Sequence, residues 1–196
     1  TLNNNSVVNL TTTGLKYLNT GLTLNNTSTW NLIGTGDLYT TDVVFNNLPS
    51  GLIDIQDDSS NISYTGAGSR ILNNTGTIRK SGASGESSIS CELKNTGVLE
   101  VLAGTLELSN TNIELTDGTY NVAAGQFLEL NSLTLTGTLT GNVAGEIIWN
   151  NALTVPTSQS ATFDFSTSGS GGVNMVSGNL TGGGTLNNQS FMKLTT

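Results

Sequence analysis

A short phrase in the middle of this chain occurs twice, first at residues 72–78 (LNNTGTI) and again at residues 93–99 (LKNTGVL). The apolar, amide, hydroxyl and glycine positions follow in the same order in both copies. The two copies begin 21 residues apart. A unit of that length is too small to enclose a core of its own, and it buries its apolar side chains only when similar units lie above and below it. The repeat therefore predicts a coil of stacked turns.

Asparagine doublets extend this spacing along the chain. They begin at positions 4, 25, 46 and 73, and a Lys-Asn pair begins at position 94, so the successive differences are 21, 21, 27 and 21. The surplus of the long interval is assigned to a loop insertion within residues 57–69, because an insertion in a solenoid bulges at a corner and leaves the register of the turns unchanged. Beyond residue 100 the phase changes, and similar phrases begin at positions 108, 130 and 149, with differences of 22 and 19.

Short segments between the doublets alternate apolar with polar residues, as in residues 98–102, 106–108 and 128–130. Such alternation is typical of a half-buried strand. At about 21 residues per turn, three strands of three to five residues, joined by Gly or Asn turns, fit one triangular turn. We therefore predict an all-β chain that forms a single right-handed parallel β-helix over residues 1–196, with about nine turns.

The fixed spacing of the asparagines has a second consequence. Amides at equivalent positions of successive turns can hydrogen-bond to one another, so Asn26, Asn47, Asn74 and Asn95 are predicted to form a structural ladder that satisfies groups left unpaired at a corner. The ordinary preference of asparagine for turns is the alternative explanation of the pattern.

Composition narrows the range of functions. The net charge is −8 with six basic residues, which disfavours nucleic acid and anionic membranes as partners. Apolar runs are short, so no transmembrane segment is expected. The chain has no histidine, which removes Ser-His-Asp and Cys-His catalysis. Cys91 is the single cysteine, and we interpret it as a packed residue rather than a nucleophile.

Two phrases resemble a known kind of repeat. Residues 95–101 (NTGVLEV) and 103–108 (AGTLEL) are similar to the β-helical turns of large secreted bacterial surface proteins, including autotransporter-type passengers, filamentous adhesins and giant cell-surface proteins of gliding Bacteroidota. The clear match covers residues 72–130. The resemblance implies a secreted or cell-surface stalk or adhesion fibre without catalytic residues. Its partners would be a glycan or another cell-surface ligand, or neighbouring solenoid copies, and the chain would be a slice of a longer repeat protein.

The candidate site residues lie in and beside the predicted insertion. Asp57 and Asp58 are the candidate ligand-binding residues, with Tyr64 as an exposed ring for stacking on a sugar. Adjacent carboxylates at the start of a loop are interpreted first as a solvated turn. A calcium site formed by Asp54, Asp57 and Asp58 is one alternative, and a catalytic acid–base pair is another. No other cofactor is expected.

Together these observations predict a non-enzymatic structural or adhesive module of a large extracellular bacterial surface protein. The alternative is a polysaccharide-binding or polysaccharide-cleaving β-helix that uses Asp57 and Asp58. A third hypothesis, ice binding, depends on residues 133–140 (LTLTGTLT), whose alternation would place four threonines on one face.

Overall fold

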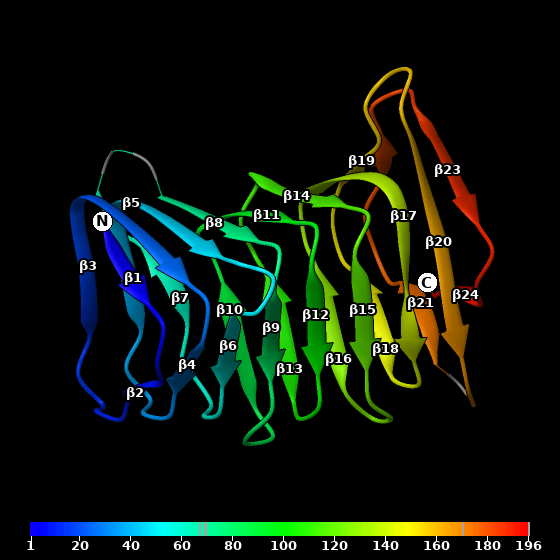
Figure 1. Ribbon diagram of the computed structural model, residues 1–196. Helices are drawn as coiled ribbons and strands as arrows, with labels where there is room; N and C mark the ends of the chain where they lie inside the picture. Colours follow the sequence, from blue (N-terminus) through cyan, green and yellow to red (C-terminus); the bar gives the residue numbers. More distant parts are fainter. Residues whose placement is uncertain (67, 69, 170, 196) are drawn as a thin grey trace.

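The chain is all-β and forms a β-solenoid of about nine turns, as the repeat predicts (Figure 1). The structure, a computed structural model, describes residues 1–66, 68, 70–169 and 171–195. The strands pair in parallel from turn to turn, and the coil advances from the N-terminal end, blue in Figure 1, to the C-terminal end, red. The described residues contain no helix, and therefore none that is long and apolar enough to cross a membrane.

Each turn contributes one strand segment to each of three faces. Face 1 consists of β1 (Leu2–Asn4), the second part of β3 (Lys16–Asn26), the second part of β5 (Leu38–Asn47), β8 (Arg70–Asn74), β11 (Glu92–Asn95), β14 (Ile113–Thr116), the first part of β17 (Leu133–Val143), β19 (Leu153–Thr154) and β22 (Leu180–Thr181).

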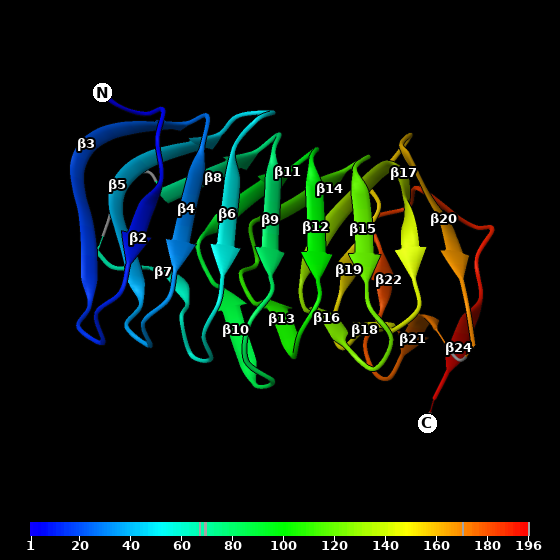
Figure 2. The same cartoon turned by 60° about the horizontal axis from the view of Figure 1, so that its bottom comes forward.

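Face 2 lies toward the viewer in Figure 2. It consists of β2 (Val8–Leu10), β4 (Thr29–Leu32), β6 (Leu52–Ile55), β9 (Thr77–Lys80), β12 (Val98–Val101), β15 (Thr119–Val122), the second part of β17, β20 (Ser160–Thr167) and β23 (Thr185–Asn188).

Face 3 closes the triangle. It consists of the first parts of β3 and β5, β7 (Ile62–Tyr64), β10 (Glu86–Ile89), β13 (Thr105–Leu108), β16 (Phe127–Leu130), β18 (Glu146–Trp149), β21 (Gly172–Met175) and β24 (Met192–Leu194).

The register of the strands follows the sequence repeats closely. Leu72 pairs with Leu93 on face 1, as the repeated phrase predicts. Leu108 pairs with Leu130, and Leu130 pairs with Trp149, so the phrases beyond residue 100 are also in register. Their phase differs because they lie on face 3 rather than face 1.

The first doublet lies one residue earlier than the spacing predicts. Asn3 pairs with Asn25 and Asn4 with Asn26, so the doublet in register is 3–4 rather than 4–5. Residues 3–5 are all asparagine, and the sequence alone did not show which two of them face the next turn.

Stacked apolar columns fill the interior of the coil. On face 1 the column consists of Leu24, Phe45, Leu72, Leu93, Ile113, Leu133 and Leu153, all of them buried. Equivalent columns rise from faces 2 and 3, and all belong to one continuous hydrophobic cluster. Because each interior turn is covered on two sides by its neighbours, no single turn forms this core by itself.

The insertion predicted at residues 57–69 is not one loop. Strand β7 lies within it and pairs with β5, so residues 62–64 belong to the regular coil. Phe45 pairs with Leu72 across the longest of the predicted intervals. The largest share of the excess length lies at the corner between β7 and β8, and the rest lies at the two preceding corners. Residues 67 and 69 of the predicted loop lie outside the described residues.

The four threonines predicted to share one face do not do so. Strand β17 turns the corner between faces 1 and 2 at Gly137, whose φ of 72° lies in the left-handed region that favours glycine. Thr134 and Thr136 therefore lie on face 1, whereas Thr138 and Thr140 lie on face 2. The flat threonine face that suggested ice binding is thus divided by a corner.

Candidate functional site

The three carboxylates proposed as a calcium site do not come together. Asp54 lies on the outer side of β6 but is only 3% exposed, because Arg79 and Gln56 hydrogen-bond to its carboxylate. Asp57 lies at the following corner, where it accepts the backbone N–H of Asp58 at 2.9 Å. No group of three or more His, Cys, Asp or Glu side chains placed to hold a metal ion occurs among the described residues.

Asp58 has a structural partner that the sequence analysis missed. Its Oδ1 accepts hydrogen bonds from Lys80 Nζ at 3.3 Å and from the backbone N–H of Gly85 at 2.8 Å. Lys80 is fully buried and occupies an apolar column between Ile55 and Val101. Its Nζ also donates to the carbonyl of Gly82. Asp58 thus joins the corner after β6 to the end of β9 and to the corner that follows β9.

This pair gives a stability prediction. We expect Asp58→Ala to lower the free energy of unfolding by about 2–4 kcal/mol, because it removes the carboxylate that balances a buried cation. Lys80→Met is expected to be close to neutral, since methionine suits the apolar column. Chemical denaturation of both variants and of the double variant checks this. If Asp58→Ala remains equally costly when residue 80 is methionine, the pairing does not explain the loss.

Tyr64 is less available to a ligand than predicted. It ends strand β7, is 38% exposed, and has the guanidinium carbon of Arg70 4.1 Å from the centre of its ring. A cation over the ring is attracted by the π-system and occupies one ring face. Only the remaining surface of the ring is free to stack on a sugar.

The predicted asparagines do form a hydrogen-bonded series inside the coil, here called the inner ladder. Asn4 donates to Asn26, Asn26 to Asn47, Asn47 to Asn74 and Asn74 to Asn95, with N–O distances of 2.6–2.8 Å. Asn95 in turn donates to the hydroxyl of Tyr120 at 3.1 Å. The next residue at this position is Leu115, so the tyrosine hydroxyl ends the ladder where the column becomes apolar.

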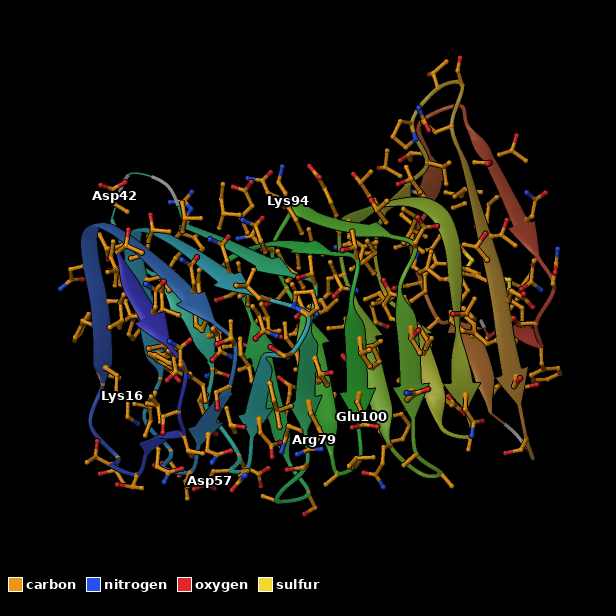
Figure 3. All side chains as sticks on the ribbon, in the orientation of Figure 1. Lys16, Asp42, Asp57, Arg79, Lys94 and Glu100 are labelled. Carbon is orange, nitrogen blue, oxygen red and sulfur yellow. The ribbon has the colours of Figure 1, made fainter. Side chains whose placement is uncertain are left out.

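A second series, the outer ladder, runs along the exterior of face 1. Asn73 donates to Asn46, Asn46 to Asn25 and Asn25 to Asn3, each at 2.9 Å. Its donors point toward the N-terminal end, whereas those of the inner ladder point toward the C-terminal end. Lys94 takes the next position, on the upper side of the coil in Figure 3, with its Nζ 3.6 Å from a carboxylate oxygen of Glu114.

Outward side chains on face 2 form a third series, which we call the polar row. Its members are Asn9, Asn31, Asp54, Arg79, Glu100, Asn121 and Asn142. In its first part each side chain has a partner: Asn31 donates to Asn9 at 2.7 Å, Gln56 bridges Asn31 and Asp54, and Arg79 donates twice to Asp54. Figure 3 shows Arg79 and Glu100 close together, where Arg79 Nη1 is 3.8 Å from Glu100 Oε2.

The Asp54–Arg79 pair predicts a pH dependence. Burial opposes ionisation of Asp54, but hydrogen bonds from Arg79, Ser81 and Gln56 outweigh it and hold the pKa of this carboxyl below its ordinary value of 3.8. A lowered pKa contributes stability that is present above pH ~4 and is lost as the pH falls through the folded-state pKa. We expect Asp54→Asn to lose less stability than the wild type below pH ~4, measured by denaturation at a series of pH values. If the free energy of unfolding falls equally steeply with pH in the two proteins, the Asp54 carboxyl is not the source of the acid sensitivity.

Beyond Glu100 the side chains of the polar row no longer hydrogen-bond to one another in the described part of the chain, and a hollow lies beside them. The hollow has a volume of about 380 Å³ and is lined by Glu100, Leu102, Asn121, Val122, Ala123, Asn142 and Ala144. Its apolar part comes from the corner after face 2, where two successive turns carry alanine at equivalent positions. Two small side chains at stacked positions leave the space that larger residues would fill.

The polar atoms of the hollow have few partners within the described part of the chain. Asn121 Oδ1 accepts the backbone N–H of Asn142 at 3.0 Å, but among the described residues neither side-chain amide donates a hydrogen bond. Glu100 has Arg79 as its ion-pair partner. The hollow therefore presents one carboxylate and two amides beside methyl groups, an arrangement able to bind a small polar ligand. Comparisons of the chain with protein-family models, with curated proteins and with solved structures found no match.

Proposed function

We propose that the chain is a non-enzymatic structural and adhesive module of a large extracellular bacterial surface protein. The observation that carries this proposal is the continuity of the coil: one apolar cluster and one parallel register run through about nine turns. A protein with these properties acts through its length and through the surfaces it displays. Its mechanical role needs no single catalytic centre.

Two features support a load-bearing role. Side-chain ladders join the turns in addition to the backbone. The inner ladder links five turns, and the paired part of the polar row, from Asn9 to Glu100, also links five. Because many of these bonds are buried or part-buried, a turn cannot separate from its neighbour without exposing unpaired amides. The stacked turns are therefore suited to transmit force along the coil.

The proposed location is tested on intact cells of the source organism. Antibodies raised against this chain should label unbroken cells or their culture medium, and external protease should remove the cell-bound signal. Labelling that appears only after the cells are permeabilised would contradict an extracellular role.

The enzymatic alternative is tested separately. The purified chain is incubated with a broad panel of polysaccharides, with and without Ca²⁺, and the release of reducing ends is measured. We expect no release. Reproducible release that disappears in Asp57→Ala would support the polysaccharide-cleaving function instead. Asp57 is preferred over Asp58 for this variant because Asp58 balances the buried Lys80.

A further inference from the structure

We propose that the hollow on face 2 binds a neutral glycan, with Glu100, Asn121 and Asn142 as its hydrogen-bonding residues. This assignment rests on the proposed adhesive function and gives it a site and a class of ligand. It places the ligand away from Asp57 and Asp58, whose carboxylates are used by the protein's own backbone and by Lys80.

The first argument is the change along the polar row. From Asn9 to Arg79 each polar side chain has a hydrogen-bond partner within the row or next to it. At Asn121 and Asn142 the amide nitrogens have no such partner in the described part of the chain, although the strands pair in the same register. Asn121 Oδ1 accepts the backbone N–H of Asn142 rather than its side-chain amide, and both residues line the hollow.

The second argument is chemical. A sugar ring carries adjacent hydroxyls that donate and accept at the same time, and planar carboxylate and amide groups can bond two of them together. Glu100 supplies an acceptor, and Asn142 supplies amide donors and an acceptor. Asn121 supplies amide donors, while its oxygen already accepts the backbone N–H of Asn142 and has one lone pair left. The C–H surface of the ring can pack against Leu102, Ala123 and Ala144, whose side chains form the apolar wall. The volume of about 380 Å³ lies within the range of ligand pockets, ~300–1,000 Å³.

The third argument concerns charge and selects the class of glycan. The hollow contains a carboxylate and no cationic side chain among its lining residues, and the whole chain has a net charge of −8. Uronic acid or sulfated chains would be repelled. Arg79 does not make the hollow attractive to anionic sugars, because it donates two hydrogen bonds to Asp54 and its third nitrogen faces Glu100. A neutral hexose chain meets neither repulsion nor an unbalanced charge.

The experiment titrates the full chain with neutral hexasaccharides, namely cellohexaose, laminarihexaose and mannohexaose. Oligogalacturonate serves as the acidic comparator. Binding is followed by two-dimensional NMR, which reports the side-chain amide signals of asparagine. We expect at least one neutral hexasaccharide to shift the signals of Asn121 and Asn142. Asn142→Ala removes a hydrogen-bonding amide and Ala144→Leu fills the space, so each should weaken binding at least tenfold.

Asn73→Ala is the matched control, because it removes an amide of the outer ladder on a different face. It should bind like the wild type. The proposal is overturned if no neutral hexasaccharide binds, if only oligogalacturonate binds, or if the two hollow variants bind as well as the control. None of these results would contradict the structural role of the coil, which the labelling of intact cells tests independently.

Discussion

Replacing Asn74 with alanine is expected to lower the free energy of unfolding by about 2–5 kcal/mol. Asn74 is fully buried, accepts from Asn47, and donates to Asn95 and to the carbonyl of Val98. Its removal leaves a buried acceptor on Asn95 and a carbonyl on Val98 without this donor, and each unsatisfied group costs about 1–3 kcal/mol. Asn47 still donates to the carbonyl of Thr77, which limits the loss at that side.

The neighbouring residue provides the control for this prediction. Asn73→Ala removes an amide of the same size from the outer ladder, where water can replace the lost partner, and should cost about 0.5 kcal/mol. Both variants are compared by chemical denaturation monitored by circular dichroism. Equal losses would mean that the inner ladder contributes no more to stability than a surface amide. A difference confined to Asn74 would show that buried pairing holds the corner together.

Replacing Leu106 with alanine is expected to cost about 2–5 kcal/mol. The side chain is fully buried on face 3. Leu106 pairs with Ser87 of the preceding turn and with Leu128 of the following turn. Truncation loses the apolar contacts and leaves a cavity that neighbouring turns fill only in part. Because each turn contacts only its neighbours, we expect the loss to appear first as faster hydrogen exchange in β10, β13 and β16.

Glu107→Ala tests the opposite side of the same strand. Glu107 points outward and pairs with Glu129, whose pKa is raised by burial and by the charges of Glu86 and Glu107. Removal of one of these charges should change the free energy of unfolding by about 0.5 kcal/mol or less and should lower the pKa of Glu129, which NMR titration measures. A large loss for Glu107→Ala, with little loss for Leu106→Ala, would reverse the inside and outside of this strand.

The register of the coil could be predicted because equivalent side chains of successive turns must stack on one another. Leucine columns and the inner ladder work only when equivalent residues stack, so the repeat at Leu72 and Leu93 identified both the fold and the predicted ladder. Errors occurred where the sequence offered two equivalent choices. One was the run of asparagines at residues 3–5, and another was the corner at Gly137, which looks like the middle of one strand in a plain alternation.

The candidate site was harder to predict, because it depends on what each side chain finds in the next turn. Asp58 has the sequence context of a solvated loop residue, and its partner Lys80 is distant in the sequence. Ile78 and Lys80 lie two residues apart on β9 and therefore share its inward face, which was the signal that Lys80 is buried. A short repeat in the sequence also indicates the hollow. Residues 121–123 and 142–144 both read NVA and lie one turn apart, which stacks one asparagine on another and one alanine on another.

The opposite directions of the two asparagine ladders bear on the partial charges at the ends of these ladders. An amide is a dipole, and amides bonded in series add their dipoles along the axis and polarise one another. If both ladders had the same direction, their moments would add and leave like partial charges side by side at each end of the pair of ladders. Since the inner ladder points one way and the outer ladder the other, their moments largely cancel from turn to turn. The turns that carry both ladders therefore have little net dipole along the axis from these amides.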